Sequence, residues 1–152
     1  MDTLDRNILA ELQADGRLTL TDLASRVGLT IGPTQRRLRI LERSGAITGY
    51  RAVVDPDALG LGFEALVFVT MKQEDRDTLA TFETEVARIT NVVQAQRLFG
   101  EPDYLLRVRT ADLDGYARLE DDVLSTLPGV QRLTSNLVMK SVVAHRPYCL
   151  DV

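Results

Sequence analysis

Residues 19–45, TLTDLASRVGLTIGPTQRRLRILERSG, carry the signals for two consecutive helices with a very short turn between them. Thr19 is placed to cap the first helix and Gly28 to end it, because a hydroxyl accepts from first-turn amides and glycine favours the left-handed conformation after a helix. Thr30 is placed to cap the second helix, which ends at Gly45. Two helices joined by a three-residue turn that contains glycine predict a helix-turn-helix, whose second helix enters the major groove of DNA.

A further helix is expected before this pair. Apolar residues at positions 4, 8, 9 and 12 recur at the spacing of one helical face and predict a helix over residues 3–14. Asp2 or Thr3 is available as its N-cap, and Gly16 follows its end. The three helices together predict a small helix-turn-helix domain.

The second helix of the pair bears a basic face. Thr34, Leu38 and Leu41 lie along one side of this helix and predict its core-facing side, and three arginines lie opposite them. A charged helix face is usually only a solvated surface, but this face carries a single sign and lies on the helix that the short turn presents. Arginine pairs with guanine or binds phosphate, and glutamine pairs with adenine. The residues predicted to contact DNA are Thr30, Gly32, Gln35, Arg36, Arg37, Arg39 and Arg43.

The charge of the chain is unevenly distributed. The 152 residues have a formal net charge of −4, from 18 Lys and Arg against 22 Asp and Glu. Residues 1–51 carry +2 and residues 52–152 carry −6, so the acidic total hides a basic N-terminal part. The single cysteine, Cys149, excludes an internal disulfide, and no apolar run reaches the length of a membrane span. The start of the chain does not resemble a signal peptide, and a cytoplasmic protein is expected.

A connector is expected after the basic helix. Residues 46–55 are rich in β-forming side chains and predict a strand, and Asp55-Pro56-Asp57 opens a turn toward Gly60. We therefore expect a helix-turn-helix domain at residues 1–45, a connector strand and linker at 46–61, and a second domain at 62–152.

The second domain is predicted to have the element order βαββαβ. The expected strands cover residues 63–72, 93–99, 104–110 and 130 to about 144, with helices around 79–89 and 112–127. This order is that of the ferredoxin-like fold, an antiparallel sheet with both helices on one face, so the fold class is α+β. The other face would carry residues such as Leu66, Phe68 and Leu106, and an apolar sheet face favours dimerisation.

Four short motifs stand in a fixed order along the chain: GLT at 28–30, RRLRILE at 36–42, GAITGY at 45–50 and GEPDYLL at 100–106. In this order they resemble the Lrp/AsnC family of feast/famine transcriptional regulators, and the resemblance covers essentially the whole chain. It implies a winged-helix-like domain that binds double-stranded DNA and a RAM domain for effector binding and oligomerisation. It also implies homodimers, often assembled into octamers, controlled by small molecules, usually amino acids, bound between RAM domains. Thr34 departs from the family, which more often has an apolar residue at this position.

The resemblance also implies an effector site. The family's loop between the middle strands falls on residues 100–104. Gly100 lets backbone amides approach a carboxylate closely, Asp103 is suited to accept from an α-ammonium group, and Tyr104 belongs to the same loop. Thr134 and Ser135 on the last strand are further candidates. The alternative is a plain hairpin turn, since Gly, Pro and Asp are common turn residues.

Two other functions remain open from the sequence. Siroheme-decarboxylase-like enzymes resemble this two-domain architecture, and a ligand-sensing assembly protein without DNA binding would also have such a second domain. The only histidine, His145, and the only cysteine, Cys149, lack the partners for a metal cluster or a catalytic triad. We expect no enzyme activity, no catalytic residue, no metal and no cofactor, and the basic helix face argues against the assembly protein.

Overall fold

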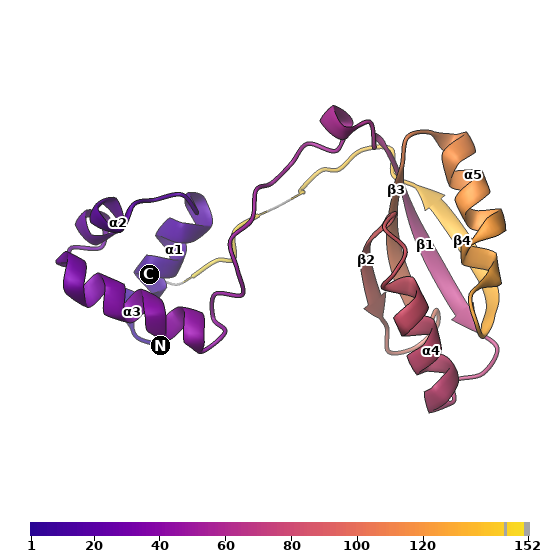
Figure 1. Cartoon of the computed structure of the whole chain (residues 1–152), viewed down its shortest axis with the longest axis horizontal. Coiled ribbons are helices and arrows are strands. Elements are labelled where there is room, and N and C mark those ends of the chain that lie inside the picture. The colour runs from indigo at the N-terminus through magenta and orange to yellow at the C-terminus, as the bar shows by residue number, and fades with distance from the viewer. Residues whose placement is uncertain (145, 151–152) are drawn as a thin grey trace. The chain divides into compact units, whose positions relative to one another are not determined.

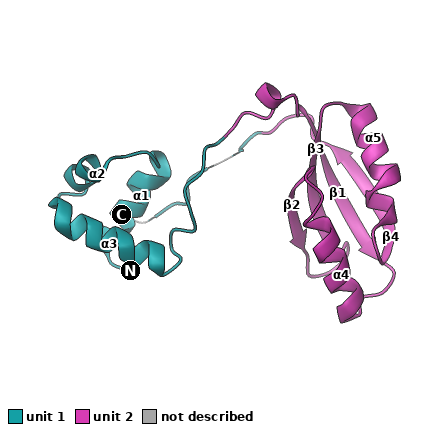
Figure 2. Cartoon of the chain, in the orientation of Figure 1, with its two compact units in different colours: residues 1–53, 142–152 teal, residues 54–141 magenta. Residues whose placement is uncertain are grey.

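The computed structural model of the chain describes residues 1–144 and 146–150. It divides into two compact units, Met1–Val53 with Val142–Val152 and Val54–Ser141 (Figure 2). The second unit is therefore inserted, in sequence, between two parts of the first. Residues 142–152 were expected in the second domain, whereas the structure groups this segment with the first unit.

The first unit contains the three expected helices (Figure 1). They are α1 (Thr3–Ala14), α2 (Leu20–Arg26) and α3 (Ile31–Arg43). Asp2 is the N-cap of α1, and its carboxylate accepts from the N–H of Asp5 at 2.9 Å. Thr19 Oγ1 accepts from the N–H of Asp22 at 3.1 Å and caps α2. The turn before α3 passes through Gly28, whose φ of +69° is in the region that favours glycine.

One apolar cluster holds these helices together. Ile8 of α1, Leu23 of α2 and Leu41 of α3 are almost completely buried in it. Thr34 is also fully buried, and its Oγ1 donates to the carbonyl of Thr30 at 2.9 Å. Because this hydroxyl is satisfied within the helix, the departure from the apolar residue usual in the family leaves no unpaired polar group in the core.

The strand expected over residues 46–55 is not formed in the described chain. A strand needs a hydrogen-bonded neighbour, and no described segment pairs with these residues. The backbone N–H of Ile47 instead donates to the carbonyl of Leu41 at 3.1 Å, which ties the start of the connector to α3.

The second unit has the predicted order βαββαβ and confirms the ferredoxin-like α+β fold. Its elements are β1 (Phe63–Met71), α4 (Arg76–Val86), β2 (Val92–Arg97), β3 (Tyr104–Thr110), α5 (Leu113–Asp122) and β4 (Val130–Leu137), with short 3-10 turns at Asp57–Leu59 and Leu124–Thr126. The sheet order is β2-β3-β1-β4, with every neighbouring pair antiparallel. None of the helices in the described part of the chain is long and apolar enough to cross a membrane.

The core of this unit lies between the sheet and its two helices. Val67 of β1 and Leu106 of β3 are opposite each other in the strand register, and both are fully buried. They share one cluster with Leu79 and Phe82 of α4 and Tyr116 of α5. Both helices therefore pack against the same face of the sheet, and the opposite face has no helix over it.

Two expectations about the strands were wrong. Leu106 was expected on the face away from the helices, but Leu105 takes that place beside Phe68. A shift of one residue in strand position moves every side chain to the other face, and alternation alone did not settle it for this strand. The last strand ends at Leu137, opposite Ala65 of β1, rather than near Ala144. The N–H of Val138 still donates to the carbonyl of Glu64 at 3.0 Å, but β1 begins at Phe63 and so cannot pair with a strand that continues to Ala144.

Candidate functional site

The outer side of α3 is an exposed basic surface. Gln35, Arg36, Arg39 and Arg43 are all exposed, and none of the three arginine side chains has an ion-pair or hydrogen-bond partner among the described residues. Gly32 lies toward the start of the helix, and nothing is within 4 Å of the place where a side chain would begin. This surface therefore has unpaired positive charge and room for a close approach of another molecule.

Arg37 is not part of this surface. Its Nη1 atom lies 2.7 Å from Asp2 Oδ2 and 2.7 Å from Asp5 Oδ1. The hydrogen bonds to Asp5 and Asp2 raise the pKa of Arg37, and the backbone hydrogen bond from Asp5 lowers the pKa of Asp2. Arg37 thus ties α3 to the first turn of α1.

The N-terminal and middle parts of α3 add residues to the open side. Thr30 is exposed at the N-cap position, and its side chain makes no capping hydrogen bond. Ile40 is 57% exposed, although it is apolar, and at helical spacing it lies between Arg36 and Arg43. Ile40 is not among the residues predicted from the sequence, although its position among the arginines was an available signal. An exposed apolar side chain on such a face suits contact with a thymine methyl group.

The predicted effector loop is a hairpin end held by backbone and side-chain bonds. The Asp103 carboxylate accepts from the N–H of Met71 at 2.7 Å, and the Asp103 N–H donates to the carbonyl of Val69 at 2.9 Å. Gly100 has a φ of +114°, which favours glycine at this position. Both Gly100 and Asp103 line a pocket of about 780 Å³ at this end of the sheet.

The same pocket contains side chains that were not predicted from the sequence. Arg97 and Thr70 line it together with Glu74 and the apolar side chains of Met71 and Leu79. Arg97 is 56% exposed, and its guanidinium lies 3.9 Å from Glu83. Arg97 precedes the loop by three residues, so its place at the mouth of the pocket depends on how the hairpin folds. The pocket therefore offers a cation as well as the carboxylate of Asp103.

Three of the predicted effector residues lie elsewhere. Tyr104 is only 2% exposed, its hydroxyl donates to Glu83 at 2.8 Å, and burial raises its pKa to about 12. Ser135 is opposite Val67, on the helix side of the sheet, where it accepts from the Tyr116 hydroxyl at 2.6 Å. Thr134 is opposite Phe68, on the other side. The structure does not bring these three residues into the pocket.

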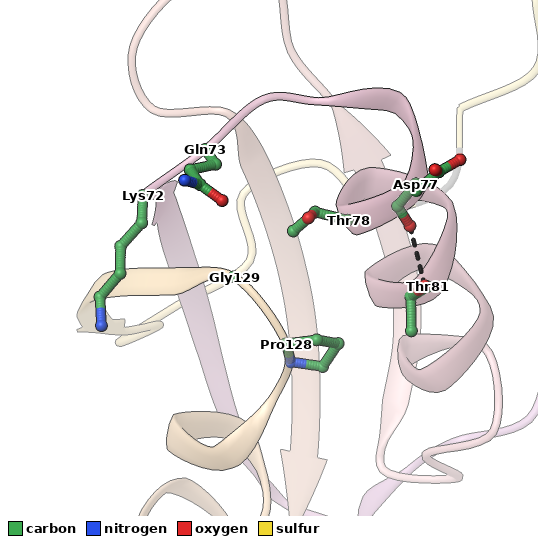
Figure 3. Close-up of a pocket in the computed structure, with 7 residues that line it drawn as sticks. All are labelled: Lys72, Gln73, Asp77, Thr78, Thr81, Pro128 and Gly129. Atoms are coloured by element: carbon green, nitrogen blue, oxygen red, sulfur yellow. Dashed lines mark hydrogen bonds between the residues drawn. The ribbon is translucent and has the colours of Figure 1, made fainter.

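A second pocket, of about 570 Å³, lies beside the start of α4 (Figure 3). Its lining combines polar side chains with a larger share of apolar surface, and the polar groups do not converge. The Thr81 hydroxyl already donates to the carbonyl of Asp77 at 2.8 Å, and the Lys72 side chain extends away from the helix (Figure 3). The loop pocket, with Asp103 and Arg97, is the better candidate for a small polar ligand.

Metal chemistry finds no support in residues 1–144 and 146–150. No group of three or more His, Cys, Asp or Glu side chains in these ranges is arranged to hold a metal ion. His145, which the sequence analysis considered for catalysis, lies outside the described residues. Cys149 is exposed.

A helix-turn-helix with an open basic second helix, joined to a ferredoxin-like domain with a loop pocket, defines a two-domain DNA-binding regulator. Family models agree with this class: residues 1–48 match the winged helix-turn-helix DNA-binding family, and residues 64–148 match the Lrp/AsnC ligand binding domain. The leucine-responsive regulatory protein of Escherichia coli K12 is 37% identical over 142 residues, 93% of this chain and 87% of that protein. The chain belongs to the Lrp/AsnC family.

Solved structures of similar chains agree with this family membership. A transcriptional regulator from Neisseria meningitidis, in complex with L-Met, has a TM-score of 0.93 and 32% identity, with 99% of this chain and 97% of that chain covered. The feast or famine regulatory protein from M. tuberculosis, complexed with L-methionine, has a TM-score of 0.85 and 33% identity, with 97% of each chain covered. These relatives are regulators, in agreement with the fold and the family.

Proposed function

We propose that the chain recognises double-stranded DNA through the outer side of α3 and that an amino acid bound in the loop pocket controls this binding. The observation that carries the proposal is the exposed face of Arg36, Arg39 and Arg43, which has no partner among the described side chains. Arginines that neutralise phosphates release counterions and so favour binding. Gln35 and Ile40 on the same helix supply an amide and an apolar side chain for base edges.

The pocket chemistry supports a zwitterionic effector. One oxygen of Asp103 is used by Met71, and the other is available to an α-ammonium group. Arg97 supplies the complementary charge for an α-carboxylate, and Gly100 allows backbone amides to approach it. Two relatives were solved with L-methionine, which supports an amino acid as the effector. Thr134 and Ser135 have no place in this proposal, because neither lines the pocket.

We further propose that the chain acts as a homodimer and assembles into a larger oligomer, such as an octamer. Leu66, Phe68 and Leu105 are half-exposed neighbours on the sheet face away from the helices. A second copy that covers this face would give the symmetric pair of recognition helices that reads half-sites about 34–36 Å apart, or a multiple of that distance. The effector then regulates by binding two arrangements of the oligomer with different affinity, because equal affinity would shift nothing.

The test is the salt dependence of DNA binding. A double variant, Arg36→Ala with Arg39→Ala, removes two phosphate-binding side chains. It should lower the slope of log affinity against log salt by about 1.8, at about 0.9 per phosphate contact. Arg88→Ala is the matched control, because Arg88 is an exposed arginine of the second unit, paired with Glu85. An unchanged slope in the double variant would remove both residues from the DNA interface.

A further inference from the structure

Three segments that are far apart in sequence meet at one pocket of the first unit. The pocket has a volume of about 410 Å³. One wall is the side of α1 that carries Leu9, Leu12 and Gln13, the second is formed by residues 46–50, and the third by Tyr148 and Leu150 near the end of the chain. The C-terminal segment 146–150, which we call the strap, therefore lies against the DNA-binding unit.

A specific pair of hydrogen bonds holds the strap. The side-chain amide of Gln13 donates from Nε2 to the carbonyl of Tyr148 at 3.2 Å and accepts at Oε1 from the Tyr148 N–H at 2.7 Å. One side chain thus satisfies both backbone groups of one residue, in the manner of a neighbouring strand. Leu150 is partly buried beside this pair, although it lies close to the end of the chain.

The pocket is also connected to the recognition helix. Residues 46–50, which form its second wall, bond to the last turn of α3 at two points. The Ile47 N–H donates to the carbonyl of Leu41 at 3.1 Å, and the Tyr50 hydroxyl donates to Glu42 Oε1 at 3.1 Å. A contiguous set of contacts therefore runs from the strap through residues 46–50 to the helix that carries Arg39 and Arg43.

We propose that the strap is the element through which the effector unit controls the DNA-binding unit: when docked, it holds residues 46–50 and the end of α3 in place. The chain leaves the first unit after Val53 and returns to it at Val142, so the strap and residues 46–50 lie near these two connections. A conformational change in the second unit that displaces either connecting segment would be transmitted along the chain to the pocket. The inference rests on effector-controlled DNA binding as proposed above.

Docking of the strap is tested without DNA or effector. Cys149 is the only cysteine of the chain and is exposed, so a nitroxide label attached there reports the motion of the strap alone. The motion of the label should be slow in the wild type and fast in Gln13→Ala, because this substitution removes both hydrogen bonds to Tyr148. Gln131→Ala, at an exposed position on β4, should leave the label slow. Equal label mobility in the wild type and in Gln13→Ala would overturn the proposal.

Coupling to DNA is tested with duplexes selected by the wild-type protein from a random pool. A chain ending at Ala144, which lacks the strap, should bind about 5- to 10-fold more weakly. Gln13→Ala should also weaken DNA binding while it keeps the wild-type circular dichroism spectrum. This variant keeps the proposal testable if the shortened chain fails to fold. L-methionine should change the label mobility in the full chain and should alter DNA affinity less in Gln13→Ala than in the wild type.

The outcomes separate the two proposals. If both strap variants bind DNA with wild-type affinity, the strap has no control function, whatever its mobility. The strap variants can behave as expected while the double variant Arg36→Ala with Arg39→Ala keeps its salt slope. In that case the strap proposal is supported, and the assignment of the DNA-contacting face is wrong. If L-methionine leaves the label mobility unchanged while it still alters DNA affinity, the effector acts by another route and the strap proposal is wrong.

Discussion

The carboxylate of Asp103 accepts a hydrogen bond from the backbone N–H of Met71 at 2.7 Å, which joins the β2–β3 hairpin loop to the last residue of β1. Only one carboxylate oxygen takes part in this bond, and the proposed effector site uses the other. In that proposal Asp103 has two functions: its carboxylate holds the loop in position and presents negative charge to the ligand. Substitutions that differ in charge and in hydrogen bonding separate these functions.

Asparagine at this position keeps an acceptor for the Met71 N–H but removes the charge. We expect Asp103→Asn to retain the thermal stability of the wild type and to bind L-methionine at least about 10-fold more weakly, because a hydrogen bond to a charged group contributes about 1.5–3 kcal/mol. Asp103→Ala loses both functions and should also melt at a lower temperature. Calorimetric titration and thermal melting measure the two effects. Asp114→Asn, on the exposed start of α5, is the charge-matched control. Unchanged affinity in Asp103→Asn would place the effector elsewhere.

Arg37 should behave differently from its neighbours on α3. Arg37→Met keeps an unbranched apolar stem but removes the guanidinium group and with it the bonds to Asp2 and Asp5. The melting temperature of the chain should fall, while the salt slope of DNA binding stays within experimental error. By contrast, Arg36→Ala should lower the slope by about 0.9 and leave the melting temperature unchanged. A loss of slope in Arg37→Met without a loss of stability would show that Arg37 contacts phosphate instead.

Local sequence signals placed the helices and the four strands of the sheet, but they also predicted a connector strand over residues 46–55 that does not form, and they did not settle the faces of the strands. Caps and glycines placed α1, α2 and α3 correctly, because these signals act within a few residues of each helix end. The positions of Leu105 and Leu106, and of Thr134 and Ser135, depend on strand register. Register is set by packing across the sheet, and a shift of one residue exchanges the two faces.

Long-range contacts were likewise beyond the sequence. In the sequence, Arg37 cannot be distinguished from the other arginines of α3. Only the packing of α1 against α3 brings Asp2 and Asp5 close to it. Arg97 joins Asp103 at the pocket through the fold of the hairpin. The bonds between Gln13 and Tyr148 join residues 135 positions apart. Local patterns carry no information on such pairs.

The second unit should lose stability in alkaline solution. Burial and the bond to Glu83 raise the pKa of Tyr104 to about 12 from its usual value near 10, and burial also raises the pKa of Tyr116. Phenols of the unfolded chain lose their protons near pH 10, while these two keep theirs in the fold. Stability is therefore fully present below pH 10 and falls as the pH rises from 10 to 12. Denaturant unfolding followed at several pH values measures this decline.

The variant Tyr104→Phe isolates one phenol. It should be less stable than the wild type at pH 7, because the bond to Glu83 is lost. Its free energy of unfolding should also fall less steeply above pH 10. The difference in slope should correspond to about one proton fewer released per molecule on unfolding. Parallel pH dependence in the two proteins would mean that Tyr104 ionises in the folded state as easily as in the unfolded chain.

Self-assembly should depend on the apolar side chains of the sheet face away from the helices. Phe68 lies opposite Leu105 in the strand register, and Leu66 is two residues away on the same face. Phe68→Asp introduces a charge that a second copy would have to bury without a partner, which is strongly unfavourable. Light scattering should then give the mass of one chain, 16.9 kDa, where the wild type gives a multiple of it.

Leu113→Asp is the control for this change, because Leu113 is 57% exposed on α5, on the helix side of the unit. It should keep the wild-type mass. The separated Phe68→Asp chains should retain the salt dependence expected for one basic face but bind DNA far more weakly than the wild type, because two linked recognition helices raise each other's effective concentration at the second half-site. Wild-type mass in Phe68→Asp, with its fold intact by circular dichroism, would move the contact between copies to another surface.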